Sequence, residues 1–136
     1  MRFSHLALAP HLLYLQVQAM LDPVSTQLDR YLTLVSQRQK VVASNSANAD
    51  TPGYQTKDFD FEAQLHAALQ APADATPAPP VASAVLGLRV KNDGNNIDLD
   101  REARLLSENA LRFNMATNFL RSQLKDLRSA ITGGNA

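Results

Sequence analysis

The chain has 136 residues and carries 13 basic and 13 acidic side chains, so its formal net charge is zero and gives no general attraction to nucleic acid or anionic lipid. It contains no cysteine, which excludes disulfides, thiolate metal sites and a thiol nucleophile. Aromatic residues make up 6% and tryptophan is absent, so few large side chains are available to build a compact core.

The first 19 residues are mostly apolar, but Pro10 and several polar residues interrupt them. The run is too short and too interrupted for a transmembrane helix, and it imitates a signal peptide only loosely. We interpret residues 1–19 as a leader that results from a start assigned too early, with Met20 as the true first residue. A cleaved signal and a genuine extra segment are the alternatives. Residues 20–136 then form a single domain.

A long helix is predicted over residues 22–50. Asp22 followed by Pro23 is typical of an N-cap and the first helical position. Apolar residues then recur at every seventh position, the period of a coiled-coil seam. The members of this seam are Leu21, Leu28, Val35, Val42 and Ala49.

Residues 51–70 are predicted to form an elbow and a short helix. Pro52 cannot continue a helix, and Gly53 suits the third position of a type II turn between Thr51 and Tyr54. The short helix is capped by Asp58 or Asp60. Its apolar face consists of Phe61, Leu65 and Leu69.

Polar and small residues alternate where the first long helix meets the elbow. Asn45, Asn48, Asp50 and Thr51 carry the amides, carboxylate and hydroxyl, and small residues between them allow close approach of another helix. Two interpretations stay open. These groups either cap the helix end and its turn within the subunit, or they bond across subunits and fix how neighbouring helices stack.

The middle of the chain is predicted to be irregular. Residues 71–84 are rich in proline and alanine and are interpreted as a flexible or polyproline-like linker. Residues 85–97 are interpreted as a strand and turn, because apolar residues alternate from Leu86 to Val90 and Asn92-Asp93-Gly94 follows. A single short β-hairpin is marginal alone, so we expect it to dock on another element.

A second long helix is predicted over residues 98–132, with Asp98 or Asp100 as its cap and Gly133-Gly134 as its end. One heptad seam consists of Leu99, Leu106, Phe113, Leu120 and Leu127. The other, offset by four, consists of Ala103, Ala110, Thr117, Leu124 and Ile131. Because such a helix is about 50 Å long, its apolar stripe must meet another helix.

The predicted fold is therefore mainly α. Two long terminal heptad helices form an elongated, coiled-coil-like pair, and between them lie an elbow, a short helix, a flexible Pro/Ala linker and a short β-hairpin. We find no spacing typical of a catalytic, metal or cofactor site, since the three histidines are scattered and no phosphate-binding glycine loop occurs. An enzyme is the least favoured class, and no small-molecule substrate is expected.

The segment from Asn45 to Tyr54, NSANADTPGY, resembles the signature of the bacterial flagellar rod and hook proteins. Within that family, the start at Met20, the KDFDF sequence after the elbow and the run GNNIDLDRE before the last helix are most similar to the proximal rod members. Residues 20–135 share the resemblance. Ser46 and Phe113 depart from the family pattern, and neither contradicts the assignment.

The resemblance implies a structural subunit of the basal-body rod, next to the inner-membrane ring and the rod–ring junction protein. It implies export through the flagellar type III apparatus, contacts with copies of itself and with other rod proteins, and no nucleic acid or cofactor. The implied assembly motif is Asn45, Asn48, Asp50, Thr51, Pro52, Gly53 and Tyr54. The alternatives are another proximal rod member, and a soluble coiled-coil adaptor or secreted interaction module.

Overall fold

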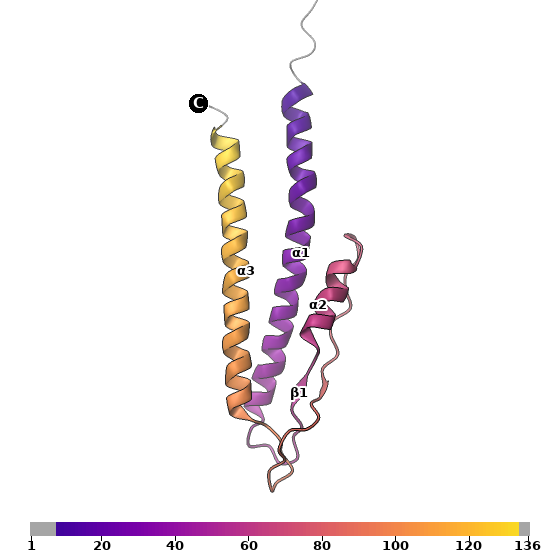
Figure 1. The fold of residues 1–136 in the computed structure, drawn as a ribbon, viewed down its shortest axis with the longest axis vertical. Coiled ribbons are helices and arrows are strands. Elements are labelled where there is room, and N and C mark those ends of the chain that lie inside the picture. Colours follow the sequence, from indigo (N-terminus) through magenta and orange to yellow (C-terminus); the bar gives the residue numbers. More distant parts are fainter. Residues whose placement is uncertain (1–7, 134–136) are drawn as a thin grey trace, which may run out of the picture.

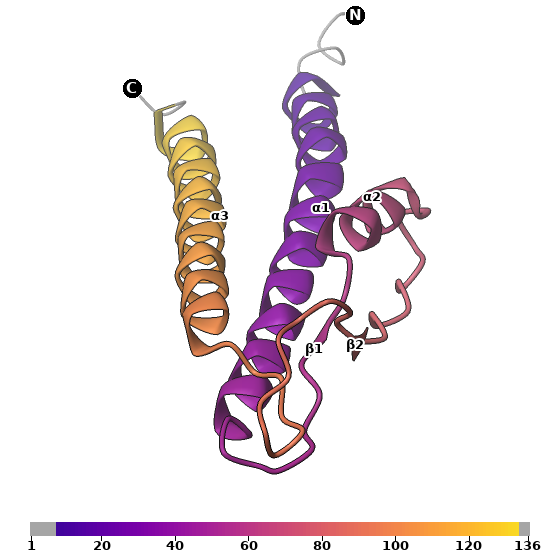
Figure 2. The same cartoon turned by 60° about the horizontal axis from the view of Figure 1, so that its bottom comes forward.

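The computed structural model describes residues 8–133 and contains three helices and two short strands within that range. Helix α1 spans Leu8–Ala47 and helix α3 spans Leu99–Gly133. The two run antiparallel and meet at the end where α1 stops and α3 starts (Figure 1). Figure 2 shows that they diverge towards the ends near the chain termini.

Helix α1 begins earlier than the sequence predicts, so the assignment of Asp22 as its cap is wrong. Pro23 lies inside α1, although a proline there removes a backbone hydrogen bond and costs about 3 kcal/mol. The residues before it are rich in leucine, alanine and glutamine, which favour a helix and carry it across the proline. Of the predicted leader, residues 8–19 belong to α1 and residues 1–7 lie outside the described range; Met20 as the true start stays a prediction.

The elbow forms the predicted turn. Gly53 has φ of 72°, and the amide of Tyr54 donates to the carbonyl of Thr51 at 3.2 Å. This is the i to i+3 bond of a type II turn, with Pro52 and Gly53 at its two central positions. The short helix that follows, α2, spans Phe61–Gln70, and Asp60 caps it by accepting from the amide of Ala63 at 2.9 Å.

The predicted β-hairpin is wrong. Strand β1, Lys57–Asp58, pairs antiparallel with β2, Ser83–Ala84, and the two are far apart in sequence. The residues predicted as a strand contain a turn at Gly87, whose φ is 79°. The apolar alternation there buries no face, since Leu86 is 90% exposed. The turn at Asn92–Gly94 does form, with Gly94 at φ 82°.

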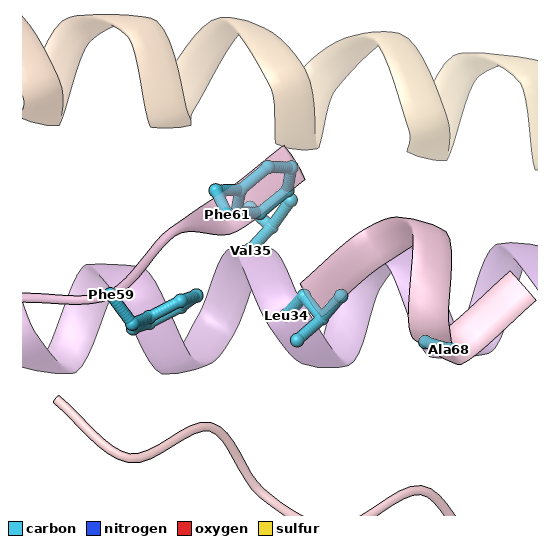
Figure 3. Close-up of a cluster of buried hydrophobic side chains, with 5 residues drawn as sticks. All are labelled: Leu34, Val35, Phe59, Phe61 and Ala68. Atoms are coloured by element: carbon cyan, nitrogen blue, oxygen red, sulfur yellow. The ribbon is translucent and has the colours of Figure 1, made fainter. Parts of the chain in front are cut away.

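Helix α1 lies between α3 and most of α2 (Figure 1), but α3 also reaches the start of α2, where the guanidinium carbon of Arg112 lies 4.3 Å from the ring centroid of Phe61. The apolar core lies on the α2 side. It consists of Leu34, Val35, Phe59, Phe61 and Ala68, with Tyr31, Val41 and Leu65 packed against it (Figure 3). The rings of Tyr31 and Phe61 meet edge to face at 6.0 Å. Because Ala68 is buried and Leu69 is not, the inner face of α2 is centred one residue earlier than the sequence suggests.

The linker after α2 is held at its start by Arg30 of α1, which is 7% exposed. Its guanidinium donates to the carbonyls of Ala68 at 2.9 Å, Ala71 at 2.8 Å, Ala75 at 2.9 Å and Pro72. These carbonyls belong to the last turn of α2 and to the chain just beyond it, where a helix leaves acceptors without partners. Arg30 therefore caps α2 from a neighbouring helix.

Candidate assembly surfaces

Asn45 is completely buried near the end of α1 and joins three elements. Its side-chain Oδ1 accepts from the amide of Lys57 at 3.0 Å, and its Nδ2 donates to the carbonyl of Lys57 at 2.8 Å. Nδ2 also donates to Oε2 of Glu102 in the first turn of α3 at 3.0 Å. A single amide thus pairs with the backbone of β1 as a strand would, and holds α3 at the same point.

A chain of charged groups runs beside Asn45. Glu102 is 1% exposed, and its Oε1 accepts from Arg101 at 2.6 Å. Arg101 also donates to Asp58 of β1 at 2.6 Å, and Arg38 of α1 approaches the same carboxylate at 3.4 Å. Buried charges are costly unless they are paired in this way. The arrangement therefore fixes α1, β1 and α3 in one relative position.

The pKa of Arg101 is raised above its ordinary value. Burial alone would lower this pKa, but the hydrogen bonds and negative charges of Asp58 and Glu102 outweigh burial. A cation whose pKa is raised by folding stabilises the fold below that pKa and ceases to do so only when the pH rises past it. The contribution of Arg101 to stability is therefore constant across the neutral range.

Two asparagines before α3 close the elbow from the other side. Asn95 is completely buried, and its Nδ2 donates to the carbonyls of Asn48 at 3.0 Å and Thr51 at 2.8 Å. Asn96 accepts from the amide of Thr56 at 2.6 Å and donates to that residue's neighbour Gln55 at 2.9 Å. Both asparagines bind the segment that links α1 to β1, so the elbow is folded by residues from the far half of the chain.

The elbow turn at Pro52-Gly53 contacts the turn at Asn92–Gly94 through the glycine of each turn. The amide of Gly53 donates to the carbonyl of Asp93 at 2.9 Å. A Cβ atom added at Gly94 would lie 3.4 Å from the Cα atom of Gly53. Since Gly94 also has positive φ, this position combines two reasons for glycine.

The assembly motif predicted from the sequence divides into an inner and an outer part. The Asn45 amide has all its partners within the chain, and the Asn48 side chain bonds to Ser44 and Thr51. Of the two open interpretations, these bonds favour the one within the subunit for both asparagines. Asp50, Thr51, Pro52 and Gly53 are exposed at the tip of the elbow, and Tyr54 is half-buried.

The residues of the predicted helix seam are placed unequally. On α1, Val35 and Val42 are buried and Leu28 is half-buried. On α3, Leu120 and Leu127 are half-buried, whereas the other four are exposed: Leu99 by 55%, Leu106 by 43%, Phe113 by 47% and Leu124 by 56%. We call these six α3 residues the heptad face.

The line of α3 that is buried against α1 lies beside the heptad face and is mainly polar. It consists of Glu102, Asn109 and Ala116, which are also spaced by seven. Asn109 donates to the carbonyl of Val35 at 2.9 Å and to Oε1 of Gln39 at 2.8 Å. The long helices are thus joined by side-chain hydrogen bonds near the elbow.

Reasoning from spacing did not single out Asn95, Asn96, Glu102 and Asn109 as structural residues. The first two could have been found from an asparagine pair that directly follows a glycine turn. The last two could have been found as a second, polar heptad beside the apolar one. Arg30 has no signal in its local sequence, because its acceptors are backbone carbonyls about 40 residues away.

Within residues 8–133 no cluster of histidine, aspartate and glutamate could hold a metal ion. No helix of that range combines the length and the apolar character needed to span a membrane.

Comparison with known proteins gives the same family from two directions. A family model described as flagella basal body rod protein matches residues 32–55, which include the end of α1 and the elbow turn. FlgB, the flagellar basal body rod protein of Escherichia coli K12, is 36% identical over 140 residues, covering 85% of this chain and all of the relative. FlgB of Salmonella typhimurium LT2 is 37% identical over 123 residues, covering 76% of this chain and 89% of the relative.

Within residues 8–133 the rest of the chain leaves the heptad face largely uncovered, which is typical of a structural subunit that assembles with others. The chain belongs to the flagellar basal body rod protein family, and its place is the flagellar basal body. The family is structural and not enzymatic. The resemblance read from the sequence is confirmed, and the matched relatives named above are FlgB proteins.

Proposed function

We propose that the chain is a subunit of the proximal rod, where it connects the inner-membrane ring with the axial rod and transmits torque for motility. The observation that carries this proposal is the heptad face of α3, which the rest of the described chain leaves largely uncovered. An exposed apolar stripe of this length is typical of an interaction surface. The names of the FlgB relatives support the rod as the assembly in question.

The energy for assembly comes from the heptad face. Leu106 and Phe113 are each about half exposed in the single chain. Complete burial of such a side chain contributes about 1.5–3 kcal/mol, of which the exposed half is still to be gained. A neighbouring helix that covers the whole face gains this at several positions. The predicted coiled-coil-like packing thus forms between subunits in addition to the contact of α1 with α3.

The partners we propose are copies of this chain, other rod proteins, the rod–ring junction protein and the inner-membrane ring. The flagellar export apparatus delivers the chain to the growing rod. An axial structure needs contacts between unlike surfaces of its subunits, because such contacts can continue as a helix of subunits instead of closing into a ring. The exposed elbow tip from Asp50 to Gly53, at the opposite end from the terminal halves of α1 and α3, supplies one such surface.

The isolated chain is expected to be a monomer that is poorly ordered beyond the elbow, with frayed terminal helices. Residues 118–133 of α3 have no buried side chain among those whose burial is described. Helices without tertiary packing are marginal in water. Circular dichroism of the purified chain checks this expectation, and a highly helical monomer that melts in one sharp transition contradicts it.

The test of the function is a charge placed on the heptad face. In a strain that lacks its own copy of the gene, Leu106→Asp and Phe113→Asp should each abolish swimming, because each buries an unpaired carboxylate in the assembled rod. Export should continue, since both positions are exposed in the single chain and become buried only in the assembled rod. Asn114→Asp is the control, because Asn114 is adjacent to Phe113 and exposed.

Swimming by either heptad-face variant at the level of the control would count against the proposal. So would the absence of the unsubstituted protein from purified basal bodies.

A further inference from the structure

A second apolar surface lies on α3, separate from the heptad face. Leu111, Met115 and Phe119 follow one another at intervals of four residues and are exposed by 60%, 64% and 48%. Side chains four apart form one ridge on a helix surface. We call these three residues the outer ridge.

The outer ridge does not face α1. Successive residues of an α-helix turn by about 100°, so Leu111 lies roughly opposite the buried Asn109. By the same geometry, Phe113 lies about 40° from Asn109. The heptad face and the outer ridge are therefore on different sides of α3, and one neighbouring helix cannot cover both.

The two surfaces differ in the size of their side chains, so that one can pack against the other. The outer ridge has three large side chains in a row. A row of smaller residues lies directly beside the heptad face and consists of Ala103, Ala110 and Thr117. A ridge of large residues on one helix packs into a groove over small residues on another.

The positions of charged residues favour a parallel over an antiparallel pair of α3 helices. Asp126 lies two turns beyond Phe119 on the outer-ridge side, and Arg121 and Arg128 lie next to the heptad face; all three are exposed. In two parallel helices at the same level, Asp126 of one is within two residues of Arg128 of the other, about 3 Å along the axis. An antiparallel pair centred on Met115 instead brings Asp126 level with residue 104, and Arg104 lies opposite Phe113 on its helix, so the heptad face offers Asp126 no cation there.

We propose that the outer ridge of one copy of this chain docks on the heptad face of α3 in a neighbouring copy, with the two helices parallel. The contact joins unlike surfaces, so it repeats from copy to copy without closing on itself as a two-fold dimer does. This proposal rests on the proposed function, and it identifies the surface that each rod subunit presents to the next.

Cysteine cross-linking tests the contact, because the natural chain has no cysteine. Cells that express Ala110→Cys and Leu111→Cys together, as two separate copies, should yield a covalent dimer after oxidation of isolated basal bodies, because the two positions lie at nearly the same level in the proposed pair. Neither variant alone should yield this dimer, because a contact between unlike faces never pairs a position with itself. Leu111→Cys combined with Lys40→Cys is the control, since Lys40 is exposed on α1.

A dimer from either variant alone overturns the proposal, because it indicates a two-fold contact. Rods that support swimming but give no mixed dimer also overturn it, and they leave the rod function itself intact. A cysteine variant that prevents rod assembly is replaced by a charge exchange. Asp126→Lys should reduce swimming and Asp126→Lys combined with Arg128→Glu should restore it; an equally impaired double variant overturns the proposal.

Discussion

The elbow end of the molecule and the outer half of α3 differ in whether their side chains have partners within the same chain. At the elbow, between residues 45–60 and 91–102, buried polar groups such as Asn45 and Asn95 bond to other parts of the same chain. On α3 beyond Ala116, apolar side chains such as Phe119 and Leu124 are exposed by about half. One region has its polar groups paired within a single copy, whereas the other leaves apolar surface that we propose a neighbouring molecule covers.

The difference shows how one subunit can have a single defined internal arrangement and also bind a neighbouring molecule. Polar bonds with fixed geometry determine a unique arrangement of α1, β1 and α3 at the elbow. Apolar surface is less directional, so it can accept a neighbour once that arrangement exists.

The largest effect is expected for Asn45→Ala. The change removes three hydrogen bonds and leaves buried Glu102 with one partner fewer, which should destabilise the elbow by about 3 kcal/mol. Hydrogen exchange of the Lys57 amide, which donates to Asn45, measures this loss directly. Ser46→Ala, at the neighbouring exposed position, is the control and should leave exchange almost unchanged, since the Ser46 hydroxyl bonds to the carbonyl of Val42 within α1. Equal exchange in both variants would mean that Asn45 does not hold the elbow.

A smaller effect is expected for Arg30→Met. It keeps the apolar stem but removes the donors that cap α2, and the freed carbonyls near Pro72 are exposed enough to find water. A loss of about 2 kcal/mol is expected, confined to α2 and the start of the linker. Amide exchange in α2 measures it, with Lys40→Met as the control on α1. Faster exchange throughout α1 would contradict a local capping role.

Two glycine substitutions separate backbone strain from crowding. Gly87→Ala and Gly94→Ala both place a side chain at positive φ, which costs about 1–2 kcal/mol. Only Gly94→Ala adds a close contact, with Gly53. Thermal unfolding should therefore show a larger loss for Gly94→Ala. Identical melting temperatures would indicate that the two turns can move apart.

The smallest effect on the single chain is expected for Leu111→Ala. Leu111 is 60% exposed, so its truncation should change the free energy of unfolding by less than about 0.5 kcal/mol. Val35→Ala, at a position that is 1% exposed, should cost several times more. Denaturant titration compares the two. A large loss for Leu111→Ala would mean that the outer ridge already has a partner within the chain.

Local signals predicted the elements that depend on local chemistry. The turn at Pro52-Gly53, the Asp60 cap of α2 and the glycine turn at Gly94 are confirmed because each is stabilised by residues within a few positions. The cap at Asp98 is confirmed for the same reason, since it accepts from the amides of Asp100 and Arg101.

The errors concern features that depend on distant residues. Strand β2 forms at Ser83 because β1 lies beside it, and nothing near Leu86 reveals that partner. The start of α1 was misplaced because Pro23 suits both the first turn and, at a cost, the interior of a helix. The side of α3 that meets α1 could not be read from hydrophobicity, since the polar line of Glu102 and Asn109 is the one buried.

The hydrogen bond between Asn45 and Glu102 also determines when the elbow can form as the chain emerges. It joins residues 57 positions apart, and the bonds of Asn95 and Asn96 to the elbow span 40 or more. A chain that emerges amino-terminus first, from a ribosome or from a narrow channel, has most of its length exposed before these partners appear. The elbow therefore closes only after the start of α3 has emerged, and a chain that ends before Glu102 never acquires this closed elbow.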